Sequence, residues 1–331
     1  DKSFVMNVLN LLRDSWNNTS YHVYAVVAPA VASQYTGIKV GQVFAGIKEL
    51  GFYDVVEAAI AGDMVSVEEA KEFVETIEEK KWKTTSCCPA FVENIKKNHP
   101  EYMDHVSTVV SPMIAMARAI RAKDRKARIV FIGPCTAKKV EIKQDDVKGA
   151  VDYVLTFEEL RAILDARGLE LAEMPEITAG EPSSYGRIFA RTGGVAESVR
   201  RVAKLEGIET EINPIRCSGI EECIKTMKLA SFGRLEENLI EGMACKGGCT
   251  NGAASIFHDQ RGIQRVNDFS RLALTDNPME GIRGYDMAGV NMEREFPELE
   301  KMKEVTAGEK KAKKQATAKA KKEAIAKGEM E

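Results

Sequence analysis

The stretch ARIVFIGPC, residues 127–135, joins a strand of the predicted core to a cysteine at its end. Its first seven residues are rich in β-branched and aromatic side chains, which predicts a buried strand over 127–133. Gly133 and Pro134 end that strand, because a glycine-proline pair is typical of a turn. Cys135 therefore stands where a core strand gives way to a loop.

The chain on both sides of this stretch alternates between strand-like and helix-like segments. Short apolar runs predict further strands over 22–28, 55–60, 151–155 and 208–215. Helical spacing and capping residues predict helices over 40–50, 66–79, 112–122, 157–166, 193–204, 219–230 and 252–257. This order predicts an α/β fold of two lobes, each with a mixed or parallel sheet flanked by helices.

The composition also changes along the chain, which suggests where these lobes begin and end. We expect residues 1–178 to form the first lobe and residues 179–300 the second. Residues 301–331 are rich in Lys, Ala and Glu, and 308–331 contain almost no large apolar side chain. Such a segment has no face to bury, so we expect a solvated tail.

Overall charge and hydropathy exclude several classes of protein. A net charge of −3 over 331 residues provides no strong field for nucleic acid or anionic lipid, so neither partner is expected. No run of about 18 apolar residues is present, so no membrane span is predicted. Seven cysteines without a secretory signal favour a reducing compartment. We therefore expect a cytoplasmic protein whose thiols serve metal or redox chemistry.

Cysteines gather in three separated segments: TTSCCPA over 84–90, GPCTAKKVE over 133–141 and EGMACKGGC over 241–249. Each segment places thiols beside Gly, Pro or small residues, where the backbone can approach a bulky inorganic group. Four thiolates from distant loops are what a cubane iron–sulfur cluster requires. We therefore expect such a cluster to be buried between the lobes, with two cysteines from each. Cys217 and Cys223 match no common ligand spacing and are expected to be ordinary buried thiols.

Spacing within the segments indicates different tasks for different cysteines. Neighbouring side chains project in different directions, so one of Cys87 and Cys88 should bind metal while the other points into an adjoining space. Two glycines between Cys245 and Cys249 allow both sulfurs to face the same object. Lys138 supplies a cation that can offset the negative charge of a thiolate cluster. The plainer interpretation makes these cysteines small buried hydrophobes and Lys138 a surface residue.

The three segments resemble the signature loops of the catalytic domain of iron-only (FeFe) hydrogenases, whose pattern is TSCCP, then PCxxKxxE, then ExMACxGGC. All three occur in order, and the resemblance extends over roughly residues 23–257. It implies an enzyme that interconverts dihydrogen with protons and electrons at an H-cluster. That cofactor is a 4Fe-4S cubane joined through a cysteine to a two-iron unit that carries CO, cyanide and a bridging dithiolate amine.

The resemblance also implies roles for individual residues. The cubane ligands would be Cys88, Cys135, Cys245 and Cys249, with Cys249 bridging to the two-iron unit. Cys87 would relay protons, because a thiol can exchange its proton in an accessible pH range. The implied pocket residues are Ala28, Pro29, Ala30, Ser86, Lys138, Phe189 and Met243, with Lys138 donating a hydrogen bond to a cyanide.

A proton route from Cys87 through an acid, a serine and a second acid is implied as well. Glu69 and Glu72 lie three residues apart on the helix predicted over 66–79, so they share a face. Ser107 would supply the hydroxyl between them. The alternative interpretation is a glutamate of a helix capping box, a solvated glutamate and a loop serine.

Five positions depart from the family pattern. Gly133 stands where a methionine usually packs near the two-iron unit, and Met113 stands where a glutamine is usual. Ala90 replaces a glycine, and GAA over 252–254 replaces three glycines. These changes resemble a divergent branch of the family and leave the implied ligands in place.

Electron transfer and maturation bear on the partners that the resemblance implies. No ferredoxin-type cysteine cluster lies outside the three segments, so no accessory cluster is predicted in this chain. The resemblance implies ferredoxin or a similar electron carrier, and maturation proteins that install the two-iron unit. Two other functions stay open: a low-turnover hydrogen sensor on the same site, and a non-enzymatic relative active in iron–sulfur assembly. The presence of Cys87, Lys138 and Met243 argues against the assembly role.

Overall fold

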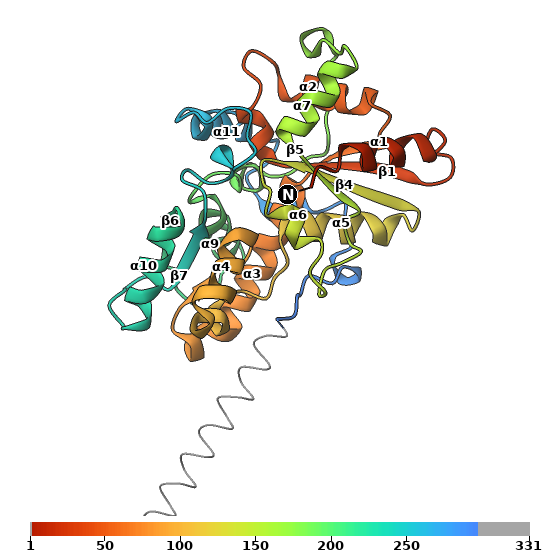
Figure 1. Ribbon diagram of the computed structural model, residues 1–331. Coiled ribbons are helices and arrows are strands. Elements are labelled where there is room, and N and C mark those ends of the chain that lie inside the picture. Colours follow the sequence, from red (N-terminus) through yellow and green to blue (C-terminus); the bar gives the residue numbers. More distant parts are fainter. Residues whose placement is uncertain (1, 297–331) are drawn as a thin grey trace, which may run out of the picture.

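The computed structural model describes residues 2–296 and contains two β-sheets in that range (Figure 1). The first sheet has the strand order β2-β1-β4-β5, and the second has the order β3-β7-β6. All strand pairs in both sheets are parallel. The strands are β1 (His22–Val27), β2 (Asp54–Glu57), β3 (Lys83–Thr84), β4 (Ala127–Gly133), β5 (Tyr153–Thr156), β6 (Pro214–Ser218) and β7 (Leu239–Met243). The predicted α/β class with parallel sheets is confirmed, although β6 covers only the end of the strand predicted over 208–215.

Helices pack around both sheets. The longer ones are α1 (Val5–Asp14), α2 (Val40–Glu49), α3 (Ala59–Lys80), α4 (Pro89–Asn98), α5 (Pro112–Lys123), α7 (Phe157–Ala166), α9 (Gly194–Leu205), α10 (Ile220–Ser231) and α11 (Gly262–Ser270). The shorter ones are α6 (Lys138–Glu141), α8 (Ser184–Ile188), α12 (Pro278–Gly281) and the 3-10 turns η1 (Pro29–Ser33), η2 (Pro100–His105), η3 (Leu171–Glu173), η4 (Cys249–Asn251) and η5 (Met287–Gly289). Helix α3 is central, because it packs against α5, α8 and α9.

The start of α3 corrects two predictions. The helix begins at Ala59, so the Ser66 hydroxyl lies within it and donates to the carbonyl of Gly62 at 2.9 Å instead of capping it. Residues 59–65 are buried all round, and a helix without an exposed face carries no amphipathic stripe in its sequence. The strand predicted over 55–60 is therefore too long, because β2 ends at Glu57 and the buried start of α3 follows at Ala59.

The helix predicted over 252–257 is also wrong. Several of its backbone amides donate to distant parts of the chain, so no continuous run of helical hydrogen bonds forms. The amide of Ala254 donates to the carbonyl of Pro134 at 2.9 Å, and the amide of Ile256 donates to the Gln34 side chain at 2.7 Å. These bonds hold the segment in an irregular path against the second cysteine loop.

The predicted lobe boundary at residue 178 stays a prediction, although strands from the two sides of it pair in one sheet. Strand β3 comes before that boundary, yet it pairs with β7 in the second sheet. The main hydrophobic core likewise contains residues from both sides, such as Val130 and Met243. The tail predicted over 301–331 lies outside the described residues.

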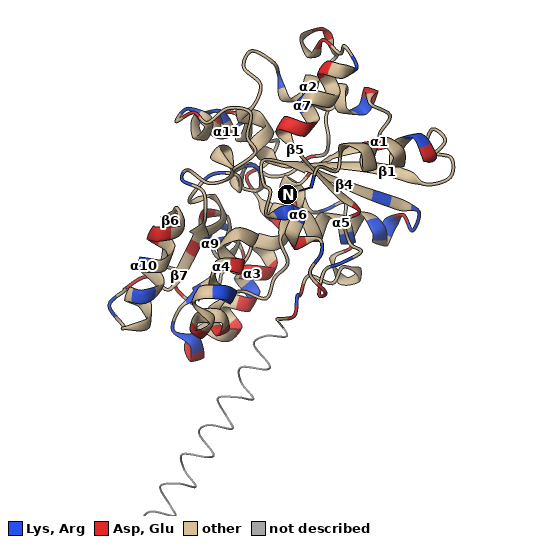
Figure 2. Cartoon of the chain, viewed as in Figure 1, with Lys and Arg blue, Asp and Glu red and all other residues tan. Residues whose placement is uncertain are grey.

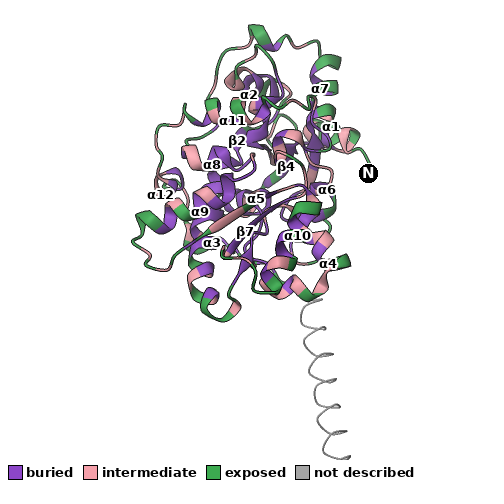
Figure 3. Ribbon diagram, turned by 90° about the vertical axis from the view of Figure 1, so that its left-hand side faces the viewer, coloured by how far each residue is buried: buried purple, intermediate pink, exposed green. Residues whose placement is uncertain are grey.

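Charged and buried residues are distributed differently over the described part of the chain. Basic and acidic residues are interspersed along the helices (Figure 2). Buried residues gather on the strands and on helices such as α5, α8 and α9 between the sheets (Figure 3). Among residues 2–296, no helix has the length and apolar character needed to cross a membrane.

Candidate active site

The three cysteine segments follow the carboxyl ends of parallel strands. Cys87 and Cys88 come after β3, Cys135 after β4, and Cys245 after β7. In α/β proteins, ligands bind beyond the carboxyl ends of the strands, where loops and helix starts converge. Here loops from both sheets supply the walls of a single cavity.

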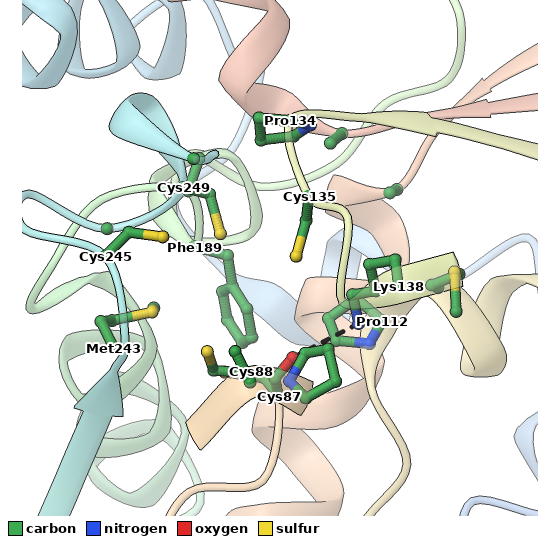
Figure 4. Close-up of a pocket in the computed structure, with 18 of the residues that line it drawn as sticks. Cys87, Cys88, Pro112, Pro134, Cys135, Lys138, Phe189, Met243, Cys245 and Cys249 are labelled. Carbon is green, nitrogen blue, oxygen red and sulfur yellow. Dashed lines mark hydrogen bonds between the residues drawn. The ribbon is translucent and has the colours of Figure 1, made fainter. Parts of the chain in front are cut away.

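This cavity has a volume of about 90 Å³ and an almost entirely apolar wall. Its wall consists of Ala28, Pro29, Ala58, Cys87, Cys88, Pro89, Ala90, Pro112, Met113, Phe131, Pro134, Cys135, Lys138, Phe189, Ala190, Met243, Ala244, Cys245, Gly248, Cys249 and Gly252. Figure 4 shows Cys135 entering this space from the second cysteine loop, and Cys245 and Cys249 entering it from the third. The four cysteines expected to hold a cubane, together with Cys87, thus share one cavity.

Glycines shape the third cysteine loop. Gly247 and Gly248 have φ values of 85° and 84°, in the left-handed region that side chains rarely adopt. A Cβ at Gly248 would lie 2.7 Å from the backbone nitrogen of Thr192. The tight turn brings Cys245 and Cys249 to the same cavity, as the sequence predicts for the two glycines between them.

Glu241, at the start of the same segment, fixes the third loop against helix α9. Its carboxylate accepts hydrogen bonds from the amide of Gly193 at 2.7 Å and from the amide of Ala196 at 2.8 Å. These amides belong to the first turn of α9, whose N-terminus favours a negative charge. Strand β7, which leads into Cys245, is therefore anchored to a helix on its flank.

The donor chemistry of the cavity fits an iron–sulfur cluster. Within residues 2–296, no set of three or more His, Cys, Asp or Glu side chains is close enough to hold a single metal ion. Thiols spaced around a cavity suit a larger, multi-iron group instead. Burial raises the pKa of Cys135 to about 11 and that of Cys249 well above its usual value. Such thiols keep their protons until a metal cation replaces them.

These raised pKa values predict the pH dependence of thiol reactivity in the cluster-free protein. The alkylation rate of Cys135 by iodoacetamide should rise about tenfold per pH unit from pH 8 to pH 10, because only the thiolate reacts and its fraction grows up to the pKa. The alkylation rate of an ordinary thiol reaches half of its maximum at about pH 8.5 and rises little above about pH 9.5. Mass spectrometry of the alkylated peptides measures each cysteine separately. A plateau of the Cys135 rate below pH 9 would contradict the effect of burial.

Lys138 places a cation at the cavity. Its side chain is 10% exposed, and its ammonium donates to the Glu141 carboxylate at 2.8 Å and to the carbonyl of Cys87 at 3.4 Å (Figure 4). Burial lowers the pKa of Lys138, but the Glu141 carboxylate more than offsets this, so the pKa lies above its usual value. The interpretation of Lys138 as a surface lysine is wrong, and the ammonium is available to an anionic group in the cavity.

Glu69 lies beside the first cysteine loop and is buried. One of its carboxylate oxygens accepts a hydrogen bond from the amide of Ser86 at 3.3 Å, and the other has no hydrogen-bond partner among the described residues. Burial and the nearby charge of Glu72 raise the pKa of Glu69 to about 8. The Glu69 charge in turn contributes to the raised pKa of Cys87, after burial itself. Glu69 is not the capping glutamate of the alternative interpretation.

Ser107 and Glu72 are joined directly, and neither contributes to the cavity wall. The Ser107 hydroxyl donates to the Glu72 carboxylate at 2.6 Å. Lys83 forms an ion pair with the same carboxylate at 2.8 Å, and both the amide and the hydroxyl of Thr108 donate to it. The structure therefore pairs two of the three predicted proton-route residues, and Glu69 lies one turn earlier on the same helix.

Two predicted pocket residues, Ala30 and Ser86, are buried but do not contribute to the cavity wall. Ser86 is held away from it, because its hydroxyl donates to the carbonyl of Val109 and its amide donates to Glu69. The other predicted pocket residues, Ala28, Pro29, Lys138, Phe189 and Met243, all contribute.

Phe131 is a wall residue that sequence reasoning missed. It lies two residues before Gly133 on β4, so both face the same side of the strand. A Cβ at Gly133 would lie 2.7 Å from the Phe131 ring and 3.2 Å from the Cβ of Ala28. The ring therefore takes the space that a side chain at position 133 would need. The unusual glycine at that position was the available signal.

Replacing Gly133 with alanine should therefore destabilise the cluster-free protein by about 1–3 kcal/mol, because the Phe131 ring must move. Urea unfolding measures this change in free energy. The same substitution at Gly284, where nothing lies within 4 Å of the added Cβ, is the matched control and should have little effect. Shortening Phe131 to leucine should relieve part of the cost. A Gly133→Ala protein as stable as the unsubstituted one would contradict this packing.

The fold and the cavity together define an α/β protein with a thiol-lined site between two parallel sheets. The family model described as "Iron only hydrogenase large subunit, C-terminal domain" matches residues 21–253. The chain therefore belongs to this family, and the predicted resemblance is confirmed.

Curated relatives include hydrogenases and iron–sulfur assembly proteins. The chain is 28% identical over 320 residues to iron hydrogenase 1 of Clostridium pasteurianum. This alignment covers 81% of the chain and 55% of that protein. The chain is 27% identical over 307 residues to the periplasmic [Fe] hydrogenase large subunit of Nitratidesulfovibrio vulgaris, covering 76% and 72%. It is 25% identical over 282 residues to cytosolic iron-sulfur assembly component 3 of Mus musculus, covering 68% and 59%. The chain thus spans little more than half of the first of these relatives.

A solved structure supports the fold. The apo [FeFe]-hydrogenase from Chlamydomonas reinhardtii, in a variant form, superimposes with a TM-score of 0.69 at 22% identity. The match covers 86% of this chain and 93% of that one. At this identity the likeness concerns the fold, and the predicted arrangement of parallel sheets flanked by helices agrees with it.

Proposed function

We propose that this protein is a hydrogenase that interconverts dihydrogen with two protons and two electrons. The observation that carries the proposal is a single apolar cavity that combines four thiols with a fifth thiol, Cys87, and a buried ammonium, Lys138. A protein that only carried a cubane for assembly would not need Cys87 beside the ligands or the Lys138 cation at the cavity wall.

Some residues of the cavity would bind the cluster, and others would shield it from water. Cys88, Cys135, Cys245 and Cys249 would hold the cubane, with Cys249 also bound to the two-iron unit. The H-cluster, when bound, supplies the heterolytic cleavage of dihydrogen. Residues such as Phe189 and Met243 line the wall and keep water out, which strengthens every electrostatic interaction inside.

Cys87 would hold the proton that enters or leaves the cavity. It lines the cavity next to Cys88 but lies outside the expected ligand set. Burial raises its pKa well above the usual value, so the resting side chain is a neutral thiol that can donate. Within the same buried region, one oxygen of Glu69 has no hydrogen-bond partner among residues 2–296 and is a suitable acceptor.

Glu69 and Glu72 would connect this thiol to solvent. A pKa of about 8 places Glu69 near the protonation midpoint at mildly alkaline pH, which suits a group that accepts and passes on a proton. The bonded pair of Ser107 and Glu72 continues the route, and Glu72 is 15% exposed at its side chain. Proton movement thus follows one face of α3.

Electrons would come from ferredoxin or a similar soluble carrier, and maturation proteins would install the two-iron unit. Such an enzyme would operate in the cytoplasm. The direct test of the function is hydrogen evolution from a reduced viologen dye, measured after the cubane and the two-iron unit have been reconstituted anaerobically. Turnover supports the proposal, and a fully loaded protein without turnover contradicts it.

Iron–sulfur assembly is the second candidate, because several curated relatives carry that name at about 25% identity. An assembly protein would bind a cubane but would take up no two-iron unit. A third candidate, a hydrogen sensor on the same site, would bind the complete H-cluster and turn over slowly. Loading and rate measured together therefore separate all three functions.

A further inference from the structure

The last described segment, residues 290–296, packs along the loop that carries Ser107. The amide of Arg294 donates to the carbonyl of Thr108 at 2.8 Å, and the amide of Val110 donates to the carbonyl of Met292 at 2.8 Å. We call residues 290–296 the strap. It lies beyond residues 21–253, the range that the family model matches.

The Arg294 side chain turns from the strap into the protein, where it is 1% exposed. Its guanidinium donates to the Asp146 carboxylate at 2.9 Å and faces an oxygen of Glu141 at 3.7 Å. That Glu141 oxygen has no hydrogen-bond partner among the described residues, and the Glu141 side chain is fully buried. Arg294 therefore supplies a cation that faces the free oxygen of Glu141.

Glu141 continues this chain of charges to the cavity. Its second oxygen accepts a hydrogen bond from Lys138 at 2.8 Å, and Lys138 contributes to the cavity wall. Lys138 shares that wall with Cys135 and Cys249, and its ammonium also donates to the carbonyl of Cys87 at 3.4 Å. Four buried groups of alternating sign thus run from the strap to the thiols: Asp146, Arg294, Glu141 and Lys138.

We infer that Arg294 is a positioning residue for the candidate active site, acting on it through Glu141 and Lys138. Arg294 partly neutralises the buried Glu141 carboxylate. The charge of the Lys138 ammonium is then less fully compensated by Glu141 and can act on a group in the cavity. This inference rests on the proposed function, since it assumes a cubane in the cavity. It adds to that function a charged element of the strap, outside the three cysteine segments.

The inference predicts two opposite shifts in the reduction of the cubane. Substituting Arg294 with methionine leaves two buried carboxylates against one ammonium, and the added negative charge opposes uptake of an electron. The equilibrium constant for reduction should fall about tenfold, or about 59 mV for a one-electron couple. Substituting Asp146 with asparagine leaves two cations against one carboxylate, so the constant should rise.

The experiment is a redox titration, followed by electron paramagnetic resonance, of protein that carries the cubane without the two-iron unit. The variants are R294M, R294K, D146N and the control R118M. Arg118 donates to the carbonyls of Asn291, Glu293 and Asp146, and its loss removes the same charge from a residue that does not contact Glu141. R294K keeps the charge and should leave the equilibrium constant close to that of the unsubstituted protein, and R118M should change the constant less than twofold.

Opposite shifts for R294M and D146N, with a small one for R118M, support the positioning role. Equal shifts for R294M and R118M would overturn it, because they would reflect a loosened strap. If R294M takes up no cubane, the variants D146N and R294K decide the question. An equilibrium constant for reduction that does not rise in D146N, or that changes strongly in R294K, overturns the inference. A failure of the proposed function is distinct, because the unsubstituted protein would then take up no cubane or show no turnover when fully loaded.

Discussion

Replacing Cys87 with alanine is expected to leave the cubane absorbance unchanged and to lower hydrogen evolution at least about 100-fold. Cys87 contributes to the cavity wall without belonging to the expected ligand set, so the cluster should still form. A positioned proton donor typically accounts for about 100- to 10,000-fold in rate. Absorbance and dye-driven hydrogen evolution, measured on the same reconstituted sample, separate the two effects.

Cys217 provides the matched control for this substitution. Cys217 is fully buried, whereas Cys87 is half-buried, and Cys217 packs in a second hydrophobic cluster and does not line the cavity. The expectation that Cys217 and Cys223 are buried thiols is confirmed by their burial. Cys217→Ala should therefore retain activity. Full activity in Cys87→Ala would rule out the proton-relay role, and loss of the cubane in that variant would show that Cys87 is needed for ligation instead.

Replacing Cys249 with alanine is expected to abolish hydrogen evolution and to prevent stable loading of the two-iron unit. Cys249 starts the η4 turn directly after two left-handed glycines, so no neighbouring thiol can take its place without rebuilding the loop. Infrared spectroscopy after maturation should show no bands of bound CO or cyanide in this variant. The control is Cys223→Ala, which removes a buried thiol outside the cavity wall and should keep the bands. An unaltered infrared spectrum in Cys249→Ala would refute its bridging role.

Much of the fold could be predicted from hydrophobic patterns. Strand β4 and helix α7 begin and end where the sequence indicates, because each shows a clear period or run bounded by turn residues. The prediction was wrong where tertiary contacts outweigh local pattern. The first turns of α3 are buried all round, and the segment 252–257 gives its amides to Pro134 and Gln34. Neither situation leaves a periodic trace in the sequence.

The candidate site was predictable to the extent that its residues lie in short motifs. The glycines and prolines around the cysteines indicate tight loops, and the structure places those loops on one cavity. Only the unusual glycine at position 133 gives a signal for Phe131, and Arg294 could not be found from the motifs at all. Phe131 has the pattern of an ordinary core residue of a strand, and Arg294 reaches Glu141 only because the fold brings two segments that are distant in the sequence into contact. Such long-range pairs depend on the fold and have no local signature.

The decisive experiment for hydrogenase function is an infrared spectrum of the protein after maturation with the two-iron unit. The unsubstituted protein should show bands of bound CO and cyanide, accompanied by hydrogen evolution. A protein that binds a cubane, yet shows no such bands under conditions that load an established FeFe hydrogenase, would not be a hydrogenase, and this result would favour the assembly role.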